Sequence, residues 1–128
     1  MNSLVVDSWA WVEYLEGSDA GRKAESAMSK SQELWTSVIS LAEVVSKYRR
    51  RGLDDEVAVR AITTLSKIGI PDLADAEEAG KIHAQFKPGS PNFGLADSFV
   101  LQLARKLGSK VLTGDPDFRK LKEAELID

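Results

Sequence analysis

Near the end of the chain, an apolar run, a turn and two acids follow one another in Lys110-Val111-Leu112-Thr113-Gly114-Asp115-Pro116-Asp117-Phe118. The short apolar run, closed by Thr-Gly, predicts a buried strand that ends in a turn. Asp115 and Asp117 follow that strand, and Pro116 restricts the backbone between them. Because a lone ionised carboxylate is costly to bury, we expect both acids beyond the strand's carboxyl end, where open α/β sheets bind ligands. The same residue types also occur in ordinary turns, and Asp115 could simply cap a helix.

Strand and helix patterns alternate along the whole chain. Strands are expected at residues 3–7, 34–36, 68–72, around Val111 and at 125–127, and helices at 8–16, 19–30, 37–51, 54–67, 74–86 and 95–107. This alternation predicts a parallel sheet with helices on both faces and right-handed crossovers. The chain has 128 residues, of which 43% are hydrophobic, and this is enough for a single core. We therefore expect one domain over residues 1–128. The Pro/Gly-rich residues 88–94 could be a substrate lip or a plain connector.

The composition excludes several classes of function. The chain has no cysteine, which excludes disulfides, thiolate zinc sites and cysteine nucleophiles. Its single histidine, His83, leaves little room for histidine metal sites or a Ser-His-Asp triad. No apolar run approaches the ~18 residues that span a bilayer, and the N-terminus lacks the features of a signal peptide, so we expect a cytoplasmic protein without membrane contact. The net charge of -3 argues against a generic basic nucleic-acid binder, but a nuclease's acids can offset a basic rim.

Asp7 and Asp97 each lie at the predicted start of a helix, so each could be a helix-capping residue or a site residue. Asp7 follows the first strand directly, in the same relation that Asp115 has to its own strand. It could equally be the N-cap of the helix that starts at Ser8. Asp97 lies in the first turn of the helix at 95–107, beside apolar residues, and a carboxylate there also interacts favourably with the helix dipole.

Glu43 is a fourth acid of interest, and it lies inside a helix. Ser40-Leu41-Ala42-Glu43 matches a capping box, but the apolar pattern begins at Val38 and places the cap near Ser37. The predicted apolar stripe of this helix consists of Val38, Leu41, Ala42, Val45 and Tyr48. An uncompensated acid beside a buried face is expensive, and a partner or a metal ion would remove that cost.

Two strand-end acids and two acids near helix starts can converge on one crevice of a doubly wound sheet. We therefore favour a single site over four coincidental caps, formed by Asp7, Glu43, Asp97 and Asp115. Oxygen ligands without histidine or cysteine select a hard cation, Mg²⁺ or Mn²⁺. Carboxylates so close together would repel one another and raise some pKa values unless a cation were bound. One or two such ions can activate water for attack on a phosphodiester.

In their order and spacing, these motifs resemble those of the PIN-domain nucleases, specifically the VapC-like toxins of bacterial and archaeal toxin–antitoxin pairs. Val5-Val6-Asp7-Ser8 resembles the family's opening strand, and residues 39–44 with Glu43 resemble its second motif. Asp97-Ser-Phe-Val-Leu-Gln-Leu-Ala resembles the third. Thr113-Gly-Asp115-Pro-Asp117-Phe118 is similar to the closing Thr-x-Asp-x-Asp-Phe, which is the most specific of the four. The likeness spans essentially the whole chain.

The resemblance implies a PIN-like three-layer α/β/α sandwich whose five-stranded parallel sheet has the order 3-2-1-4-5. It implies an Mg²⁺- or Mn²⁺-dependent endoribonuclease with one or two ions, a homodimer, and a small VapB-like antitoxin that inserts a segment into the active site. The implied catalytic and metal-site acids are Asp7, Glu43, Asp97 and Asp115, with Asp117 assisting. Ser8 and Thr113 would hydrogen-bond these acids or a metal-bound water.

Basic and aromatic residues near these motifs have two interpretations each. Lys47, Arg49 and Arg50 end the helix that carries Glu43. They fit a solvated helix end favoured by the dipole, and the alternative is contact with RNA phosphates. The tryptophans at positions 9, 11 and 35 fit core or interface positions better than base-stacking platforms. Trp9 departs from the small polar residue often found at its position in the family.

Two other classes of protein fit part of the pattern. The first is a catalytically silent binding module of the same fold, against which the complete set of acids argues. The second is a phospho-aspartate receiver domain, whose size and α/β alternation match and whose acceptor would be Asp72. A receiver domain also needs paired acids after its first strand, whereas Asp7 is followed by Ser8 and Trp9.

Overall fold

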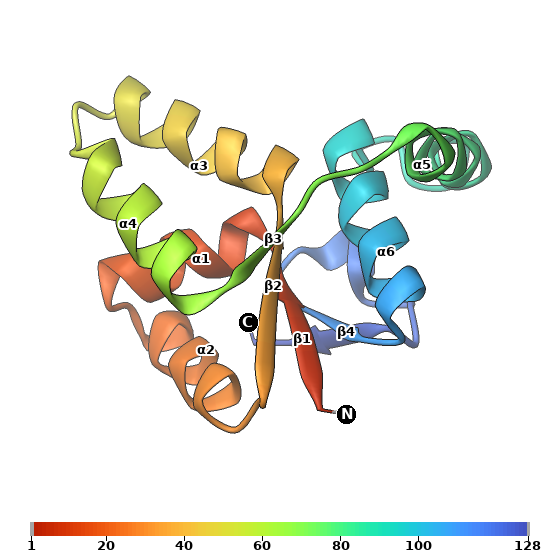
Figure 1. The fold of residues 1–128 in the computed structure, drawn as a ribbon. Helices are drawn as coiled ribbons and strands as arrows, with labels where there is room; N and C mark the ends of the chain where they lie inside the picture. Colours follow the sequence, from red (N-terminus) through yellow and green to blue (C-terminus); the bar gives the residue numbers. More distant parts are fainter. Residues whose placement is uncertain (1, 128) are drawn as a thin grey trace.

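The computed structural model describes residues 2–127, and these form a five-stranded parallel sheet between two layers of helices (Figure 1). The strands are β1 (Ser3–Val6), β2 (Glu33–Ser37), β3 (Lys67–Gly69), β4 (Lys110–Thr113) and β5 (Ala124–Leu126). Their order across the sheet is β3-β2-β1-β4-β5, and every neighbouring pair is parallel. This confirms the predicted α/β/α sandwich and its strand order.

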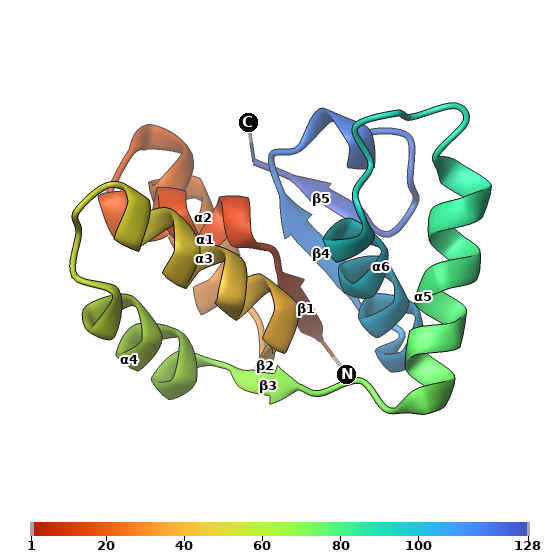
Figure 2. The same cartoon turned by 90° about the horizontal axis from the view of Figure 1, so that it is seen from above.

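The helices divide between the two faces of the sheet. They are α1 (Ser8–Glu16), α2 (Asp19–Ser29), α3 (Val38–Arg50), α4 (Asp55–Leu65), α5 (Leu73–Phe86) and α6 (Leu95–Leu107), with a short 3₁₀ turn η1 (Pro116–Phe118). Figures 1 and 2 show α1 to α4 on one face and α5 with α6 on the other. No helix within residues 2–127 combines the length and the apolar character that crossing a membrane requires.

The two central strands are buried on both faces, which explains why their sequences are apolar without alternation. Val5 and Val111 contribute to a core layer that contains residues of α5 and α6. Leu4, Val6 and Leu112 point the other way, into the layer formed with α1 to α4. Each central strand therefore contributes to both cores.

The pairing of β1 with β4 brings the two ends of the chain together. Val5 pairs with Val111 and Val6 with Leu112. The backbone N–H of Asp7 then donates to the carbonyl of Leu112 at 3.2 Å, which continues the pairing beyond β1. The segments that follow these two strands consequently leave the same edge of the sheet, side by side.

Two predicted boundaries near the third strand are wrong. The helix expected at 54–67 ends at Leu65 because Ser66 is extended, with φ -135° and ψ 159°. The Ser66 hydroxyl donates to the carbonyl of Ile62 at 2.7 Å. The strand expected at 68–72 is shorter and ends at Gly69. Pro71 has no N–H to continue it, and Asp72 is already the N-cap of α5.

A close approach between α1 and α2 yields a test of the packing. A Cβ at Gly21 would overlap the backbone carbonyl of Glu13, so Gly21→Ala should lower the free energy of unfolding by about 1–3 kcal/mol. Urea denaturation would measure this. Gly80 is the matched control, because it is an exposed helical glycine with open space around an added Cβ. Gly80→Ala should raise stability by up to about 1 kcal/mol, and equal effects at both positions would contradict the packing.

Candidate functional site

A cleft of about 290 Å³ opens beyond the carboxyl ends of β1 and β4. It is lined by Ser8, Trp9, Val12, Glu43, Val44, Lys47, Arg50, Asp97 and Asp115. These residues belong to α1, α3, α6 and the loop after β4, which are far apart in the sequence. The predicted convergence is therefore present: Glu43 and Asp97 face the same space as Asp115.

Asp7 does not itself line the cleft, but it directly precedes Ser8, which does, and it is buried with a fractional exposure of 6%. Its Oδ1 accepts a hydrogen bond of 2.8 Å from the Ala10 N–H, so Asp7 is the N-cap of α1. Burial raises the pKa of Asp7 to about 7. Hydrogen bonds from Thr113 and Ala10 oppose this rise, whereas the charges of Asp115 and Asp97 add to it.

Asp97 is half-buried, and its geometry is also that of a helix start. The Gly94 N–H donates to Asp97 Oδ2 at 2.8 Å. Desolvation by burial raises the pKa of Asp97 to about 6, although the Gly94 bond opposes it. The charges of Asp115, Glu43 and Asp117 raise this pKa further, so the carboxylates are close enough to repel one another.

Asp115 is held by the turn that follows β4. Its Oδ1 accepts from the Asp117 N–H at 2.9 Å, and its own N–H donates to Thr113 Oγ1 at 3.0 Å. Thr113 therefore contacts both Asp7 and the Asp115 backbone, as expected of a supporting residue. Asp117 does not line the cleft; its pKa is raised by desolvation and by the neighbouring charge of Asp115.

Glu43 reaches the cleft from α3, but not for the reason that the apolar pattern indicated. The buried residues of α3 are Ser40, Val44 and Tyr48, and Ala42 is exposed, so the predicted stripe was partly wrong. Glu43 itself is solvent-exposed. Partial desolvation nevertheless raises the pKa of its carboxyl, and a hydrogen bond from Ser8 opposes that rise.

Three of the acids have the geometry of caps and still leave one carboxylate oxygen outside the capping bond. Asp7, Asp97 and Asp115 each anchor one carboxylate oxygen on a backbone N–H. Each carboxylate has a second oxygen, which the cap does not use. The backbone bonds thus orient the acids, and the cleft brings them together.

The chemistry of these donors fits a hard divalent cation. They are carboxylates and hydroxyls, without histidine or cysteine, and a cation would relieve their mutual repulsion. Within residues 2–127, no three acidic or histidine side chains already surround one point as metal ligands would. Mg²⁺ commonly keeps several waters and takes only one or two protein carboxylates directly, so a preformed cage is not required.

The basic residues of α3 do not act as one group. Lys47 and Arg50 line the cleft. Arg49 instead forms an ion pair with Asp55, with 2.9 Å between Nε and Oδ1. Arg49 therefore does not share the position of Lys47 and Arg50, because successive helical residues point in different directions.

Comparison with known proteins identifies the family of this chain. A family model described as PIN domain matches residues 4–124. No curated protein sequence matches the chain. The chain belongs to the PIN domain family.

Several solved structures share the fold at low sequence identity. A toxin–antitoxin complex from Klebsiella pneumoniae has a TM-score of 0.78 and 16% identity, covering 98% of both chains. Mycobacterium tuberculosis VapC20, described as a sarcin-ricin loop cleaving toxin, has a TM-score of 0.76 and 18% identity, covering 93% of this chain and 95% of that one. VapBC2 from Rickettsia felis, bound to a promoter DNA fragment, has a TM-score of 0.74 and 15% identity, covering 98% and 99%.

The raised pKa of Asp7 predicts a pH-dependent stability in EDTA. Between about pH 4 and pH 7 the unfolded chain loses this proton while the folded protein keeps it, so stability should fall as the pH rises. The loss could reach about 4 kcal/mol at pH 8. Asp7→Asn keeps an oxygen to cap Ala10 but does not titrate, so thermal melts should show a flatter profile and higher stability at pH 8. An unchanged pH profile in this variant would contradict the burial argument.

Proposed function

We propose that this protein is a metal-dependent endoribonuclease that acts as the toxin of a type II toxin–antitoxin pair. The observation that carries the proposal is the convergence of acids from distant segments on one cleft at the switch point between β1 and β4. Membership of the PIN domain family and the fold shared with VapC toxins support it. The proposed catalytic and metal-binding acids are Asp7, Glu43, Asp97 and Asp115, with Asp117 assisting.

Bound Mg²⁺ or Mn²⁺, as one or two ions, would supply a polarised water and neutralise charge on the phosphate. The protein's own residues orient this chemistry. Asp7, Asp97 and Asp115 are fixed by backbone N–H donors, so their remaining oxygens need little reorganisation. Ser8 steadies Glu43 by a hydrogen bond. Lys47 and Arg50 place positive charge along the same cleft, where a phosphate backbone would lie.

The partners follow from the same proposal. The structural neighbours from Klebsiella pneumoniae and Rickettsia felis are described as a toxin–antitoxin complex and as VapBC2, which supports a VapB-like antitoxin as the partner of this chain. We also propose a homodimer and a cytoplasmic location, where RNA substrates are available. The receiver-domain alternative has no support, because Asp72 follows the edge strand β3 and its Oδ1 accepts from the Asp75 N–H at 2.8 Å.

The purified protein should cleave RNA with Mn²⁺ or Mg²⁺ and stop when EDTA is added. Asp97→Asn should lower kcat by about 100-fold or more, because the amide keeps the Gly94 bond but removes a charged ligand. Asp19→Asn is the control, since Asp19 is exposed on α2 and its variant should cleave like the unmodified protein. Gel analysis of a labelled RNA would measure both. Full activity of Asp97→Asn would overturn the proposal, and metal binding without cleavage would favour the silent module.

Lys47→Ala and Arg50→Ala should each weaken RNA binding and reduce its dependence on salt concentration, because each removes a cation from the cleft. Arg49→Ala removes the same charge from the same helix, but its side chain is paired with Asp55 outside the cleft. It should therefore change binding much less. Filter binding or anisotropy at several salt concentrations would compare the three, and equal losses would show that only net charge matters.

A further inference from the structure

We propose that Trp9 contacts an unpaired RNA base beside the scissile phosphate and thereby determines where the RNA is cut. The inference rests on the proposed nuclease function, whose substrate it specifies further. The proposal gives Trp9 a role in binding RNA. Neither membership of the PIN domain family nor the acids of the cleft imply this role.

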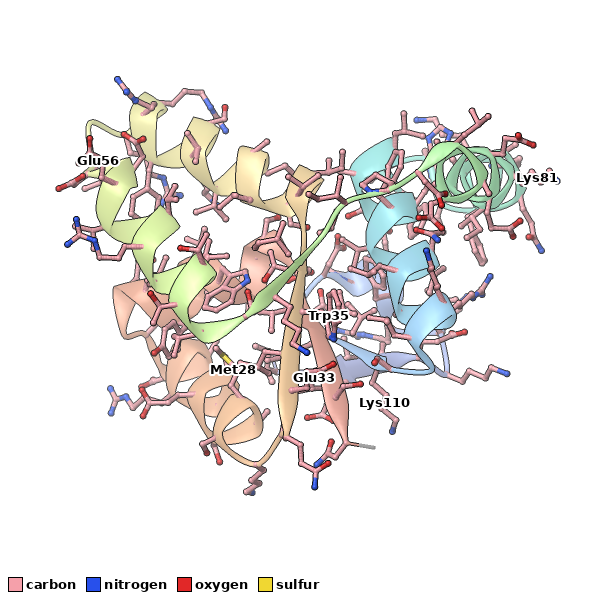
Figure 3. The ribbon with its side chains drawn as sticks, viewed as in Figure 1. Met28, Glu33, Trp35, Glu56, Lys81 and Lys110 are labelled. Carbon is pink, nitrogen blue, oxygen red and sulfur yellow. The ribbon has the colours of Figure 1, made fainter. Side chains whose placement is uncertain are left out.

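The three tryptophans lie in different environments. Trp11 is fully buried, and its Nε1–H donates to Thr36 Oγ1 at 3.0 Å. Trp35, on β2 near Glu33 (Figure 3), donates its Nε1–H to the Glu33 carboxylate. The Lys67 amino group lies 5.6 Å from the centroid of the Trp35 ring. These two indoles are accounted for by contacts within the protein.

Trp9 is the tryptophan that lines the acid cleft. It is half-buried, so part of the ring remains accessible. Within the described residues 2–127, its indole N–H has no hydrogen-bond partner, unlike those of the other two tryptophans. A tryptophan with a free N–H, in a cleft that also holds acids and cations, presents both an aromatic surface and a donor to a ligand.

Gly114 holds the ring in this position. The Trp9 atoms Cη2, Cζ3 and Cε3 lie where a side chain at residue 114 would begin, well inside van der Waals contact with an added Cβ. Only glycine therefore allows this packing. These atoms belong to the benzo edge of the indole, and the N–H is on the other side of the ring. Gly114 directly precedes Asp115, and Trp9 follows Asp7 by two residues, so the indole of one acid-bearing segment packs against the backbone of the other.

A nucleobase is the occupant that matches this chemistry. Lys47 and Arg50 in the same cleft suit phosphates, and the base attached to such a phosphate would lie within reach of the cleft wall. Bases stack on aromatic side chains when they are unpaired, whereas bases inside a duplex are already stacked. The indole N–H can additionally donate to a base carbonyl or ring nitrogen, which distinguishes one base from another.

A binding experiment tests the contact without any cleavage. Trp35→Phe removes one fluorophore outside the cleft, and Trp11 is buried, so Trp9 reports on ligands. Titration with each nucleoside 5′-monophosphate in the presence of Mg²⁺ should quench the fluorescence saturably and to different extents for different bases. Ribose 5-phosphate, which has no base, should quench little. Equal quenching by ribose 5-phosphate, or no quenching by any nucleotide, would overturn the proposal.

A cleavage experiment tests the role in specificity. On a pool of random RNA sequences with Mn²⁺, Trp9→Ser should alter the pattern of cut sites and raise KM by about 5- to 100-fold, with a smaller change in kcat. Trp9→Phe should keep most of the affinity but lose the preference that depends on the N–H. Gly114→Ala should resemble Trp9→Ser, because its methyl group displaces the ring. Trp35→Phe should leave the cut sites unchanged.

Thermal melts establish that each variant is folded before cleavage is compared. A folded Trp9→Ser protein that cuts the same sites with the same KM would overturn the role of Trp9 and leave the nuclease function intact. If the unmodified protein cuts no RNA with either metal, the proposed function fails instead. In that case the nucleotide titration still shows whether Trp9 contacts a base. The same titration serves if Trp9→Ser does not fold, because it does not use that variant.

Discussion

The pairing of β1 with β4 is the constraint on which the rest of the structure depends. It joins the first and fourth strands through the registers Val5 with Val111 and Val6 with Leu112. Asp7 and Asp115 consequently leave the same edge of the sheet, and Thr113 contacts both segments. Because each of these strands is buried on both faces, a one-residue shift of register would move side chains that fit one core into the other and would separate the acids. Core and site are thus determined by the same pairing.

A capping bond does not use up the carboxylate that makes it. A carboxylate has two oxygens, and at Asp7, Asp97 and Asp115 a backbone N–H occupies one of them. The helix starts supply orientation, while burial raises the pKa of Asp7 and Asp97 and the charges of the neighbouring acids add to that rise. Desolvation is the larger cause of both shifts, so the site stores an electrostatic cost that a cation would offset.

Most of the architecture could be predicted because the determining patterns are local. The helices α1 and α6 have the predicted bounds, and the order of the sheet agrees with the family resemblance. One error lies where tertiary contacts override a local pattern. The buried face of α3 contains Ser40, Val44 and Tyr48, because α4 and α1 pack against that side of the helix. The apolar pattern of a helix predicts that one face is buried, but it does not locate that face to within one residue. The third strand ends at Gly69 for a local reason, since Pro71 and the Asp72 cap follow it directly.

Residue type and spacing alone predict the alternation of strands and helices, the four candidate acids and the lack of cysteine ligands. Which neighbouring residues face the same cleft depends on the fold. It separates Arg49 from Lys47 and Arg50 by pairing it with Asp55, and it distinguishes Trp9 from Trp11 and Trp35. The physical reason is that adjacent residues on a helix point in different directions, and what each one meets depends on distant segments of the chain.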